Sequence, residues 1–327
     1  MRGSKIERRT IVKGLAAAPL LIATAARAQS WPDKPVRVLV PFSPGSATDV
    51  VARLIGDSLS RGLGQTFVVE NRAGAGGTIA ATQVAKAPPD GYMLLVHSSG
   101  HTVNPALYKD LQYDTVKDLT GVSTLAQQPN ILVCATARGW KSAADLVAAA
   151  KAAPGKLTYA SAGTGSGTHM NAEKFKASAG FDALHVPYKG TPEALNDTMN
   201  GRVDFFFAPV VAALGLVREG RITALAAGSA GRSSVLPDVP TTQEAGFAGS
   251  AYEFWVGMLA AAATPAAILE KLNGEIRKIL AAPETRERLA SLGAEAMYST
   301  PADFNARIVR EIAENGPIVE AAGIKAQ

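Results

Sequence analysis

Apolar and polar positions along the chain predict strands and helices in alternation. Residues 36–42 (VRVLVPF) form a short, apolar, β-branched run bounded by prolines, which is typical of a buried strand. Residues 47–59 then carry apolar side chains at helical spacing. The same order follows with a strand at 66–70, a helix at 77–87 and a strand at 92–97. Continuous apolar strands separated by helices predict a parallel sheet that is covered on both faces.

A second series of the same kind begins near residue 130. Its expected strands lie at 130–135, 156–161, 183–188, 202–209 and 222–229. Its expected helices lie at 141–155, from about 169, at 191–201, and once more before the last of these strands. A further strand is expected at 252–262, followed by three helices that begin at Thr264-Pro265, run over 284–292, and extend from Thr300-Pro301 to about Ala322.

The predicted fold class is therefore α/β, with two lobes that are each a mostly parallel sheet with flanking helices, and a ligand cleft between the lobes. No glycine- and serine-rich linker separates the two series, which suits lobes joined by short crossover strands, and the candidate crossovers are residues 120–133 and 251–259. The expected division is residues 1–28 for an export signal, 29–130 for the first part of lobe 1, 131–250 for lobe 2, and 251–327 for the completion of lobe 1 with the C-terminal helices.

The first 28 residues have the pattern of a cleaved export signal. Arg8 and Arg9 lie in a basic segment, the apolar run at 14–26 is too short to cross a bilayer as a mature helix, and ARAQ offers a cleavage site after about Ala28. The segment RRTIVK resembles a twin-arginine signal. A general secretory signal with two chance arginines and a non-cleaved membrane anchor are the alternatives. The mature protein is expected to be exported.

The net charge of the chain differs once this segment is removed. Six of the 33 basic residues and one of the 28 acidic residues lie in it, so the mature chain carries equal numbers of each. No basic surplus remains to attract nucleic acid, which is therefore not an expected partner. A chain of 327 residues with 47% hydrophobic residues can bury a sizeable core.

The residues that carry chemistry form no catalytic pattern. No serine has glycine at both −2 and +2, and no mature serine has lysine at +3, so no nucleophile motif is present. No histidine, cysteine and aspartate cluster has metal-ligand spacing. Each of His97, His101, His169 and His185 is expected in the core or a loop, with ligand contact as the alternative. Cys134 is expected to be a buried strand residue, and we predict neither an enzyme nor a metal site.

The stretch YASAGTGSGTHMNAEKF, residues 159–175, predicts a strand, a glycine-rich turn and a helix. Its G-x-G-x-G spacing lacks the lysine of a Walker loop and differs from the G-x-G-x-x-G of dinucleotide sites. The next strand ends in Tyr188-Lys189 rather than in an acidic residue, so no nucleotide cofactor is expected. Free N–H groups at the start of a helix favour an anion, and a carboxylate fits such a site as a phosphate does.

Two further loops rich in hydrogen-bond donors follow predicted strands. In VPFSPGSATDVVAR, Ser46 or Thr48 can cap the helix, and an ordinary strand-to-helix turn is the alternative reading. In HSSGHTVNPALY, Ser98, His101 and Asn104 follow the strand at 92–97. Ligands of open α/β sheets bind outside the carboxyl ends of the strands. Three such loops from both lobes predict a ligand clamped between the lobes.

Six segments in order resemble the extracytoplasmic solute receptors of the tripartite tricarboxylate transporter family, often called Bug proteins. They are WPDKPVRVLVPFSPGSATDVVAR, VVENRAGAGGTIAA, APPDGYMLL, SAGTGSGTHMNAEKF, VPYKGTPEALNDTMNGRVDFFF and PDVPTTQEAGF. The resemblance covers essentially the whole mature chain, and ENRAGAGGTIAA and VPYKG are its most specific parts. It implies a periplasmic-binding-protein fold that closes on a small carboxylate and delivers it to a cognate membrane permease. A monomer without a cofactor is expected. A sensor-only receptor, and more remotely an exported hydrolase or lyase, are the alternatives.

Carried onto this chain, the resemblance places the ligand between loops 42–49 and 161–169, with further candidates outside them. The expected ligand-binding residues are Phe42, Ser43, Gly45, Ser46, Thr48, Asp49, Ser98, His101, Asn104, Ser161, Gly163, Thr164, Gly165, Ser166, Thr168, His169, Lys189, Gly190 and Asp204. Lys189 either pairs with a carboxylate or is solvated, and Asp204 either contacts ligand or satisfies a neighbouring loop. Asn71 and Arg72 are expected to hold the loop around Gly74–Gly77.

One departure from the family pattern lies in the first loop. The family commonly shows a Gly-Gly pair there, whereas this chain has Gly45-Ser46. The serine adds a side chain and a donor where the backbone approaches the ligand. The identity of the carboxylate therefore stays open among citrate, short dicarboxylates, amino acids and aromatic acids.

Overall fold

The computed structural model describes residues 31–326. The predicted export signal at residues 1–28, with its twin-arginine segment and its cleavage site, lies outside the described residues. The part of the chain from Pro32 onward forms one compact unit. Within residues 31–326, no helix combines the length and the apolar character that a membrane span requires.

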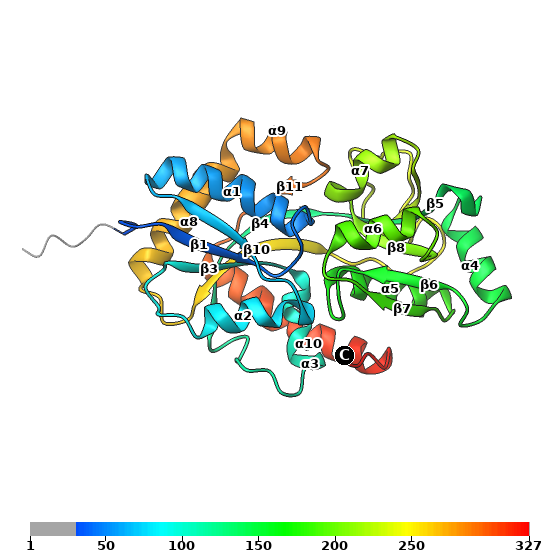
Figure 1. The fold of residues 1–327 in the computed structure, drawn as a ribbon, viewed down its shortest axis with the longest axis horizontal. Helices are drawn as coiled ribbons and strands as arrows, with labels where there is room; N and C mark the ends of the chain where they lie inside the picture. The colour runs from blue at the N-terminus through cyan, green and yellow to red at the C-terminus, as the bar shows by residue number, and fades with distance from the viewer. Residues whose placement is uncertain (1–30, 327) are drawn as a thin grey trace, which may run out of the picture. The chain divides into compact units, whose positions relative to one another are not determined.

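Six strands form a first sheet in the order β11-β4-β10-β3-β1-β2 (Figure 1). Their bounds are β1 Val36–Val40, β2 Phe67–Asn71, β3 Met93–Ser98, β4 Leu119–Gln128, β10 Phe254–Ala261 and β11 Glu295–Ala296. The first strands pair as predicted, because β1 runs parallel to both β2 and β3. β10 runs antiparallel to β3 and β4, so the sheet is mixed.

Helices cover both faces of this sheet, as the apolar strands predicted. They are α1 Ala47–Leu63, α2 Thr78–Ala85, α3 Asn104–Leu107, α8 Ala266–Ala281, α9 Pro283–Ser291 and α10 Pro301–Ala321, with short turns η1 Ala75–Gly77 and η2 Ser99–Thr102. Figure 1 shows α1 and α8 on one side of the sheet and α2 and α10 on the other. On the second side, Leu39, Leu95 and Leu259 of the strands form one buried cluster with Ala81 and Phe304 of the helices. The three predicted C-terminal helices are confirmed as α8, α9 and α10.

Five strands form a second sheet in the order β7-β6-β8-β5-β9. Their bounds are β5 Asn130–Ala135, β6 Thr158–Ser161, β7 Leu184–Pro187, β8 Phe205–Pro209 and β9 Ile222–Ala227. β6 runs parallel to β7 and β8, whereas β5 runs antiparallel to β8 and β9. Its helices are α4 Ala143–Ala152, α5 Gly167–Ala179, α6 Thr191–Met199 and α7 Val210–Arg218, with the turn η3 Thr136–Arg138.

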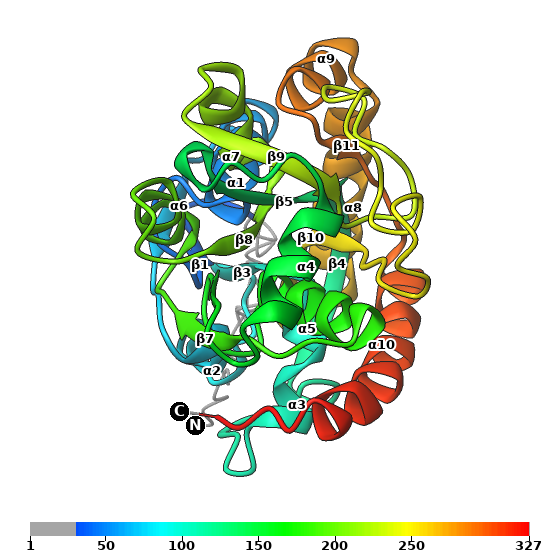
Figure 2. The ribbon, with the colours of Figure 1, turned by 90° about the vertical axis from the view of Figure 1, so that its right-hand side faces the viewer.

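The side chains of β8 show how this sheet is covered on both faces. Phe205 and Phe207 lie in one buried cluster with residues of α4 and α5, and Phe206 lies in another with residues of α6 and α7. All three rings are fully buried. Figure 2 shows α4 and α5 together on one side of this sheet and α6 and α7 on the other. The alternation along β8 is that of a strand with helices on both faces.

The chain passes directly between the two sheets, which explains their mixed direction. β4 ends at Gln128 and β5 begins at Asn130, so only Pro129 separates them. The chain returns to the first sheet through β10 (Figure 1). These passages fall at the two predicted crossovers. A strand that arrives without a crossover helix enters antiparallel to its neighbours, and this adds antiparallel pairs to the predicted parallel cores. Below, the first sheet and its helices are called the first half, and the second sheet and its helices the second half.

Candidate anion-binding site

Two helices, one from each half, begin with the same local structure. Ser46 precedes α1 with φ −66° and ψ 157°, and its Oγ accepts a hydrogen bond from Asp49 N at 3.4 Å. Ser166 precedes α5 with φ −64° and ψ 158°, and its Oγ accepts from His169 N at 3.3 Å. Both serines are buried. Each cap satisfies the third N–H of its helix and leaves the first two N–H groups to point outward.

These outward N–H groups face a single small cavity, which we call the helix-end cavity. In the described residues, the backbone N–H groups of Ala47, Thr48, Gly167 and Thr168 have no hydrogen-bond partner. The cavity has a volume of ≈ 10 Å³. Its polar lining comes from Ser46, Thr48, Ser98, Ser166, Thr168 and Thr191. Two helix N-termini, with orphan donors and the positive ends of both helix dipoles at the cavity, make it favourable for a negative charge.

Ser98 supplies an independent indication that the cavity receives a polar group. Its side chain is 1% exposed and lines the cavity, and its Oγ has no hydrogen-bond partner among the described residues. A buried hydroxyl without a partner is costly, and such groups are rare in folded proteins. Ser98 is the last residue of β3, so this donor comes from the carboxyl end of a third strand.

A wider cleft of ≈ 480 Å³ adjoins the helix-end cavity, and Phe42 and Ala162 belong to the walls of both. The other residues that line it are Pro41, Gly74–Gly77, Tyr108, Gly163, Thr164, Pro187, Tyr188, Lys189 and Glu193. Lys189 and Glu193 are the charged residues of this lining within the described chain, and both are exposed. Since their charges are opposite, the positive potential of the site comes mainly from the helix ends.

The loop before α1 is held in place by the side chains of Asp49 and Asn71, which bond to the protein and do not face the cavity. The Asp49 carboxylate accepts hydrogen bonds from Gly45 N at 2.9 Å, from Arg53 Nε at 3.0 Å, and from Asn71 Nδ2 at 2.8 Å. Burial tends to raise the pKa of Asp49, but these three hydrogen bonds outweigh it, so the pKa is lowered. Asn71 also donates to the carbonyl of Phe42 at 2.9 Å. Asn71 therefore holds the loop 42–49, and not the glycine loop near Gly74 that we expected it to hold.

The two halves touch at the mouth of the cleft through Ser43. Its N–H donates to the Lys189 carbonyl at 3.3 Å, and its Oγ donates to Glu193 Oε1 at 2.6 Å. Gly190 makes this approach possible, because a Cβ at that position would lie 2.7 Å from Ser43 Cβ. Gly76 makes a second close approach possible, since a Cβ there would lie 2.6 Å from the Thr164 carbonyl oxygen. The halves are thus in contact at two places beside the cleft.

The structure brings most of the predicted ligand residues together. Those that line the cavity or the cleft are Phe42, Ser46, Thr48, Ser98, Gly163, Thr164, Ser166, Thr168 and Lys189. Ser43, Gly45 and Gly190 lie in the turns where the halves meet. Ser161 and Gly165 are bonded within their own loop, since Gly163 N donates to Ser161 Oγ and Gly165 N donates to His169 Nδ1.

Besides Asp49, which holds its own loop, four more predicted residues lie apart from the cavity and cleft. Asp204 precedes β8, at the end of the strand opposite to the carboxyl end, where it accepts from Thr158 N and Oγ1 and pairs with Arg138. Its alternative reading, the satisfaction of a neighbouring loop, describes what the structure shows. His101 and Asn104 are buried in the first half near Tyr113. The ring of His169 points behind the glycine loop, toward Tyr159.

Several lining residues were not among the predicted ones. Outside the predicted loops 42–49 and 161–169 they are Pro41, Gly74–Gly77, Tyr108, Pro187, Tyr188, Thr191, Glu193, Pro209 and Phe254. The loop Gly74–Gly77 follows the carboxyl end of β2, so the strand-end rule that identified the other loops applies to it as well. Phe254 carries no such signal, because it reaches the cavity from the crossover strand β10.

Within residues 31–326, the remaining reactive groups form neither an activated thiol nor a metal-binding cluster. Burial raises the pKa of the Cys134 thiol to about 11, so the thiol stays protonated and unreactive at neutral pH. Among residues 31–326, no group of three or more histidine, cysteine or acidic side chains could hold a metal ion. The donors that are available are backbone N–H groups and hydroxyls, which bind anions without covalent chemistry.

A family model described as "Tripartite tricarboxylate transporter family receptor" matches residues 51–324. Among curated relatives, the UPF0065 protein in the tcbD-tcbE intergenic region of Pseudomonas sp. strain P51 is 38% identical over 300 residues, which are 91% of this chain and 89% of that protein. Protein BugT of Bordetella pertussis is 34% identical over 316 residues, which are 96% of this chain and 97% of that protein.

Solved structures with similar folds include proteins with bound dicarboxylates. R. palustris Rpa4515 with adipate has a TM-score of 0.87 and 35% identity, covering 90% of this chain and 99% of that one. MatC from Rhodopseudomonas palustris with bound malate has a TM-score of 0.84 and 34% identity, covering 88% and 100%. The periplasmic binding protein BugD has a TM-score of 0.86 and 33% identity, covering 91% and 100%. The predicted α/β periplasmic-binding-protein fold is confirmed by these likenesses.

Replacing Asn71 tests how the first loop is held. We expect Asn71→Ala to lower the free energy of unfolding by about 1–3 kcal/mol, because it leaves the Phe42 carbonyl without a donor and removes one of the three donors to the Asp49 carboxylate. Arg72→Ala is the matched control, since Arg72 makes only an exposed ion pair with Glu70 and should cost less than about 1 kcal/mol. Urea unfolding measures both. Equal losses in the two variants would contradict this account of the loop.

Proposed function

The chain belongs to the tripartite tricarboxylate transporter receptor family, and we propose that it is a periplasmic receptor that captures a small carboxylate between its two halves and delivers it to a transporter of that type. The observation that carries this proposal is the helix-end cavity, where orphan N–H groups of α1 and α5 meet the unpartnered Ser98 hydroxyl. Export to the periplasm, with cleavage after about Ala28, is part of the proposal.

The dimensions favour a ligand with one carboxylate oxygen in the cavity and its remaining atoms in the cleft. A volume of ≈ 10 Å³ is about the smallest that admits one water-sized group. The adjoining cleft of ≈ 480 Å³ lies within the usual range of small-molecule sites. Its walls present Phe42, Tyr108 and Tyr188 together with glycine backbone, so they suit a mainly apolar or hydroxylated carbon chain.

Short dicarboxylates are the first ligand class to test. Two similar structures contain adipate and malate, and each of these ligands carries a carboxylate at either end of a short chain. In this chain Lys189 lies at the cleft and could meet a second carboxylate, whereas Glu193 beside it would oppose one. We propose that this pair of opposite charges selects among dicarboxylates by where the second carboxylate lies.

We further propose that the halves are lobes that close on the ligand by a hinge motion. The boundaries would be those expected from the sequence, with residues 29–130 and 251–327 in one lobe and 131–250 in the other. The hinge would lie in the passages from β4 to β5 and from β9 to β10, because these are the places where the chain passes between the sheets. The Ser43 contacts with Lys189 and Glu193 would then belong to the closed form. The receptor acts by binding and release, without catalysis.

A thermal-shift screen tests the ligand class. A carboxylate at 100 times its dissociation constant should raise the free energy of unfolding by about 2.7 kcal/mol, because it binds only the folded state. Adipate and malate are compared with their neutral diamides, which have the same carbon skeletons. We expect a rise in the melting temperature with at least one diacid and none with its diamide. Equal shifts with an acid and its diamide, or shifts with cationic solutes alone, would refute the proposal.

Replacing Ser43 tests closure. We expect Ser43→Ala to weaken binding of the carboxylate found in the screen by about 5-fold, mainly through faster dissociation, because it removes a hydrogen bond between the halves. Ser58→Ala on α1 is the control, since its hydroxyl donates to the Leu54 carbonyl and accepts from Arg61, both within its own helix. Rate constants come from stopped-flow fluorescence. An unchanged dissociation rate for Ser43→Ala would show that this contact does not hold the cleft closed.

A further inference from the structure

A buried chain of polar side chains lies behind the glycine loop, on the side away from the cavity. Gly165 N donates to His169 Nδ1 at 3.0 Å, and His169 Nε2 lies 3.0 Å from the Tyr159 hydroxyl oxygen. The Tyr159 hydroxyl is in turn hydrogen-bonded to Glu173. His169 is 2% exposed and Tyr159 is 1% exposed. These side chains line neither the cavity nor the cleft, so any effect they have on a ligand passes through the loop.

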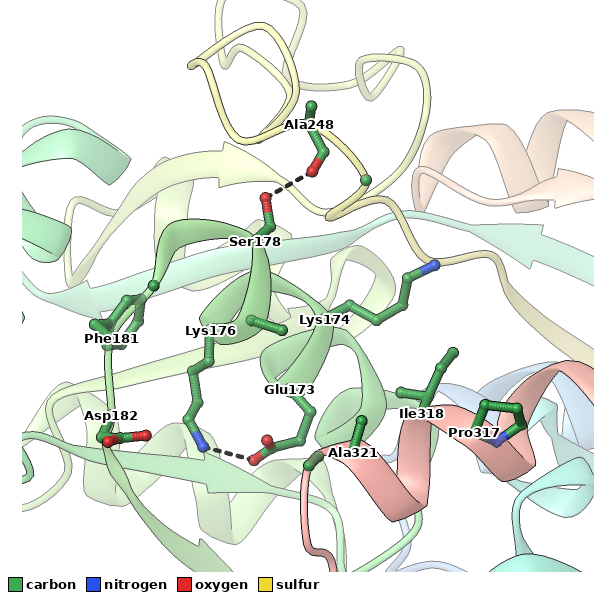
Figure 3. Close-up of a pocket in the computed structure, with 14 residues that line it drawn as sticks. Glu173, Lys174, Lys176, Ser178, Phe181, Asp182, Ala248, Pro317, Ile318 and Ala321 are labelled. Carbon is green, nitrogen blue, oxygen red and sulfur yellow. Dashed lines mark hydrogen bonds and ion pairs between the residues drawn. The ribbon is translucent and has the colours of Figure 1, made fainter.

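The outer end of this series of hydrogen-bonded side chains is the Glu173 carboxylate, which is held by Lys176. Lys176 Nζ donates to Glu173 Oε1 at 2.9 Å, at the wall of a groove of ≈ 680 Å³ between α5 and α10 (Figure 3). Burial tends to raise the pKa of Glu173, but the nearby His169 Nε2, at 3.7 Å, and the hydrogen bonds from Tyr159 and Lys176 outweigh it and lower the pKa to about 2. Glu173 is therefore ionised at neutral pH and acts only as a hydrogen-bond acceptor.

The ionised Glu173 determines where each proton of the chain lies. Because a carboxylate cannot donate, the single hydroxyl proton of Tyr159 points to Glu173. The Tyr159 oxygen must then accept from His169, so Nε2 of His169 carries a proton. The Gly165 N–H donates to Nδ1, so Nδ1 is an acceptor without a proton and the ring is in its Nε2–H tautomer. Each link of the chain is thus satisfied by one tautomer of His169.

A second histidine lies against the ring of His169. The ring of His185 on β7 stacks on that of His169 with centroids 3.9 Å apart. Burial lowers the pKa of His185 to about 3, so His185 is neutral. The His185 Nε2 lies 2.6 Å from Ser161 Oγ, which accepts from Gly163 N. Both histidines therefore hold the glycine loop from behind.

The hydrogen bonds of the loop decide which N–H groups face the ligand. Ala162 N donates to Thr168 Oγ1, Gly163 N to Ser161 Oγ, and Ser166 N to the Gly163 carbonyl. With Gly165 N turned to His169, these donors are occupied within the protein. The N–H groups of Gly167 and Thr168 are left for the helix-end cavity.

We propose that His169 is a positioning residue of the anion site, and that its unprotonated Nδ1 fixes the glycine loop through Gly165 in the Nε2–H tautomer set by Tyr159 and Glu173. The proposal rests on the proposed function only in so far as this loop receives a carboxylate. The geometry of the loop itself can be tested without any ligand.

Two measurements on the ligand-free full-length protein test this role. The first records the ring nitrogens of His169 by NMR at neutral pH, where we expect a proton on Nε2 and none on Nδ1. The second compares His169→Asn with His169→Gln through hydrogen exchange of the Gly165 amide. The Asn side chain places an oxygen where Nδ1 lies, and the Gln side chain reaches instead to the position of Nε2. We expect protection of Gly165 to be retained in His169→Asn and to fall about tenfold in His169→Gln, because a buried N–H is left unpaired.

The outcomes separate this proposal from that of the function. If His169 acted only by filling space, Gln would replace it better than Asn, because Gln is closer to histidine in size. Protection of the Gly165 amide in His169→Gln that equals or exceeds that in His169→Asn would therefore overturn the proposal. A proton on Nδ1 in the wild-type spectrum would overturn it even if neither variant folds. Adipate affinity, measured by calorimetry, should follow the same order, with His169→Gln weaker than His169→Asn. If adipate does not bind the wild-type protein, that result counts against the choice of ligand, and the Gly165 exchange rates still decide the role of His169.

Discussion

The start of a helix leaves N–H groups that its own backbone cannot satisfy, and the candidate site is built on this constraint. Here α1 and α5 belong to different halves, and their N-cap residues, Ser46 and Ser166, have nearly the same backbone angles. Both helices direct their first two N–H groups into the same cavity. Bringing two positive helix ends together is favourable only if an anion lies between them. The loops, the glycines that permit close approach and the buried chain behind Gly165 all serve to hold this arrangement.

Much of the architecture could be predicted from the sequence, because apolar strands and capped helices leave local patterns. Periodicity and turn residues correctly placed the strands from β1, at Val36, to β10, at Ala261. They also placed the loops after β1, β3 and β6. The direction of the crossover strands could not be predicted in this way. Whether β5 and β10 run parallel or antiparallel depends on the path of the chain between the sheets, which no local pattern records.

The site could be predicted as a set of loops, but not side chain by side chain. Asp204 lies at the amino end of β8, and a strict use of the strand-end rule would have excluded it. His169 follows the caps in sequence, yet its ring turns toward Tyr159, ten residues earlier on β6. Thr191 and Phe254 reach the cavity only because α6 and β10 converge there from distant parts of the chain.

The measurement that tests the central claim most directly is an assigned amide NMR titration of the protein with a carboxylate that binds it. If the carboxylate lies between the helix ends, the N–H resonances of Ala47, Thr48, Gly167 and Thr168 should shift most, and all four should saturate at the same ligand concentration. Shifts confined to one half, or centred on the groove between α5 and α10, would contradict the account.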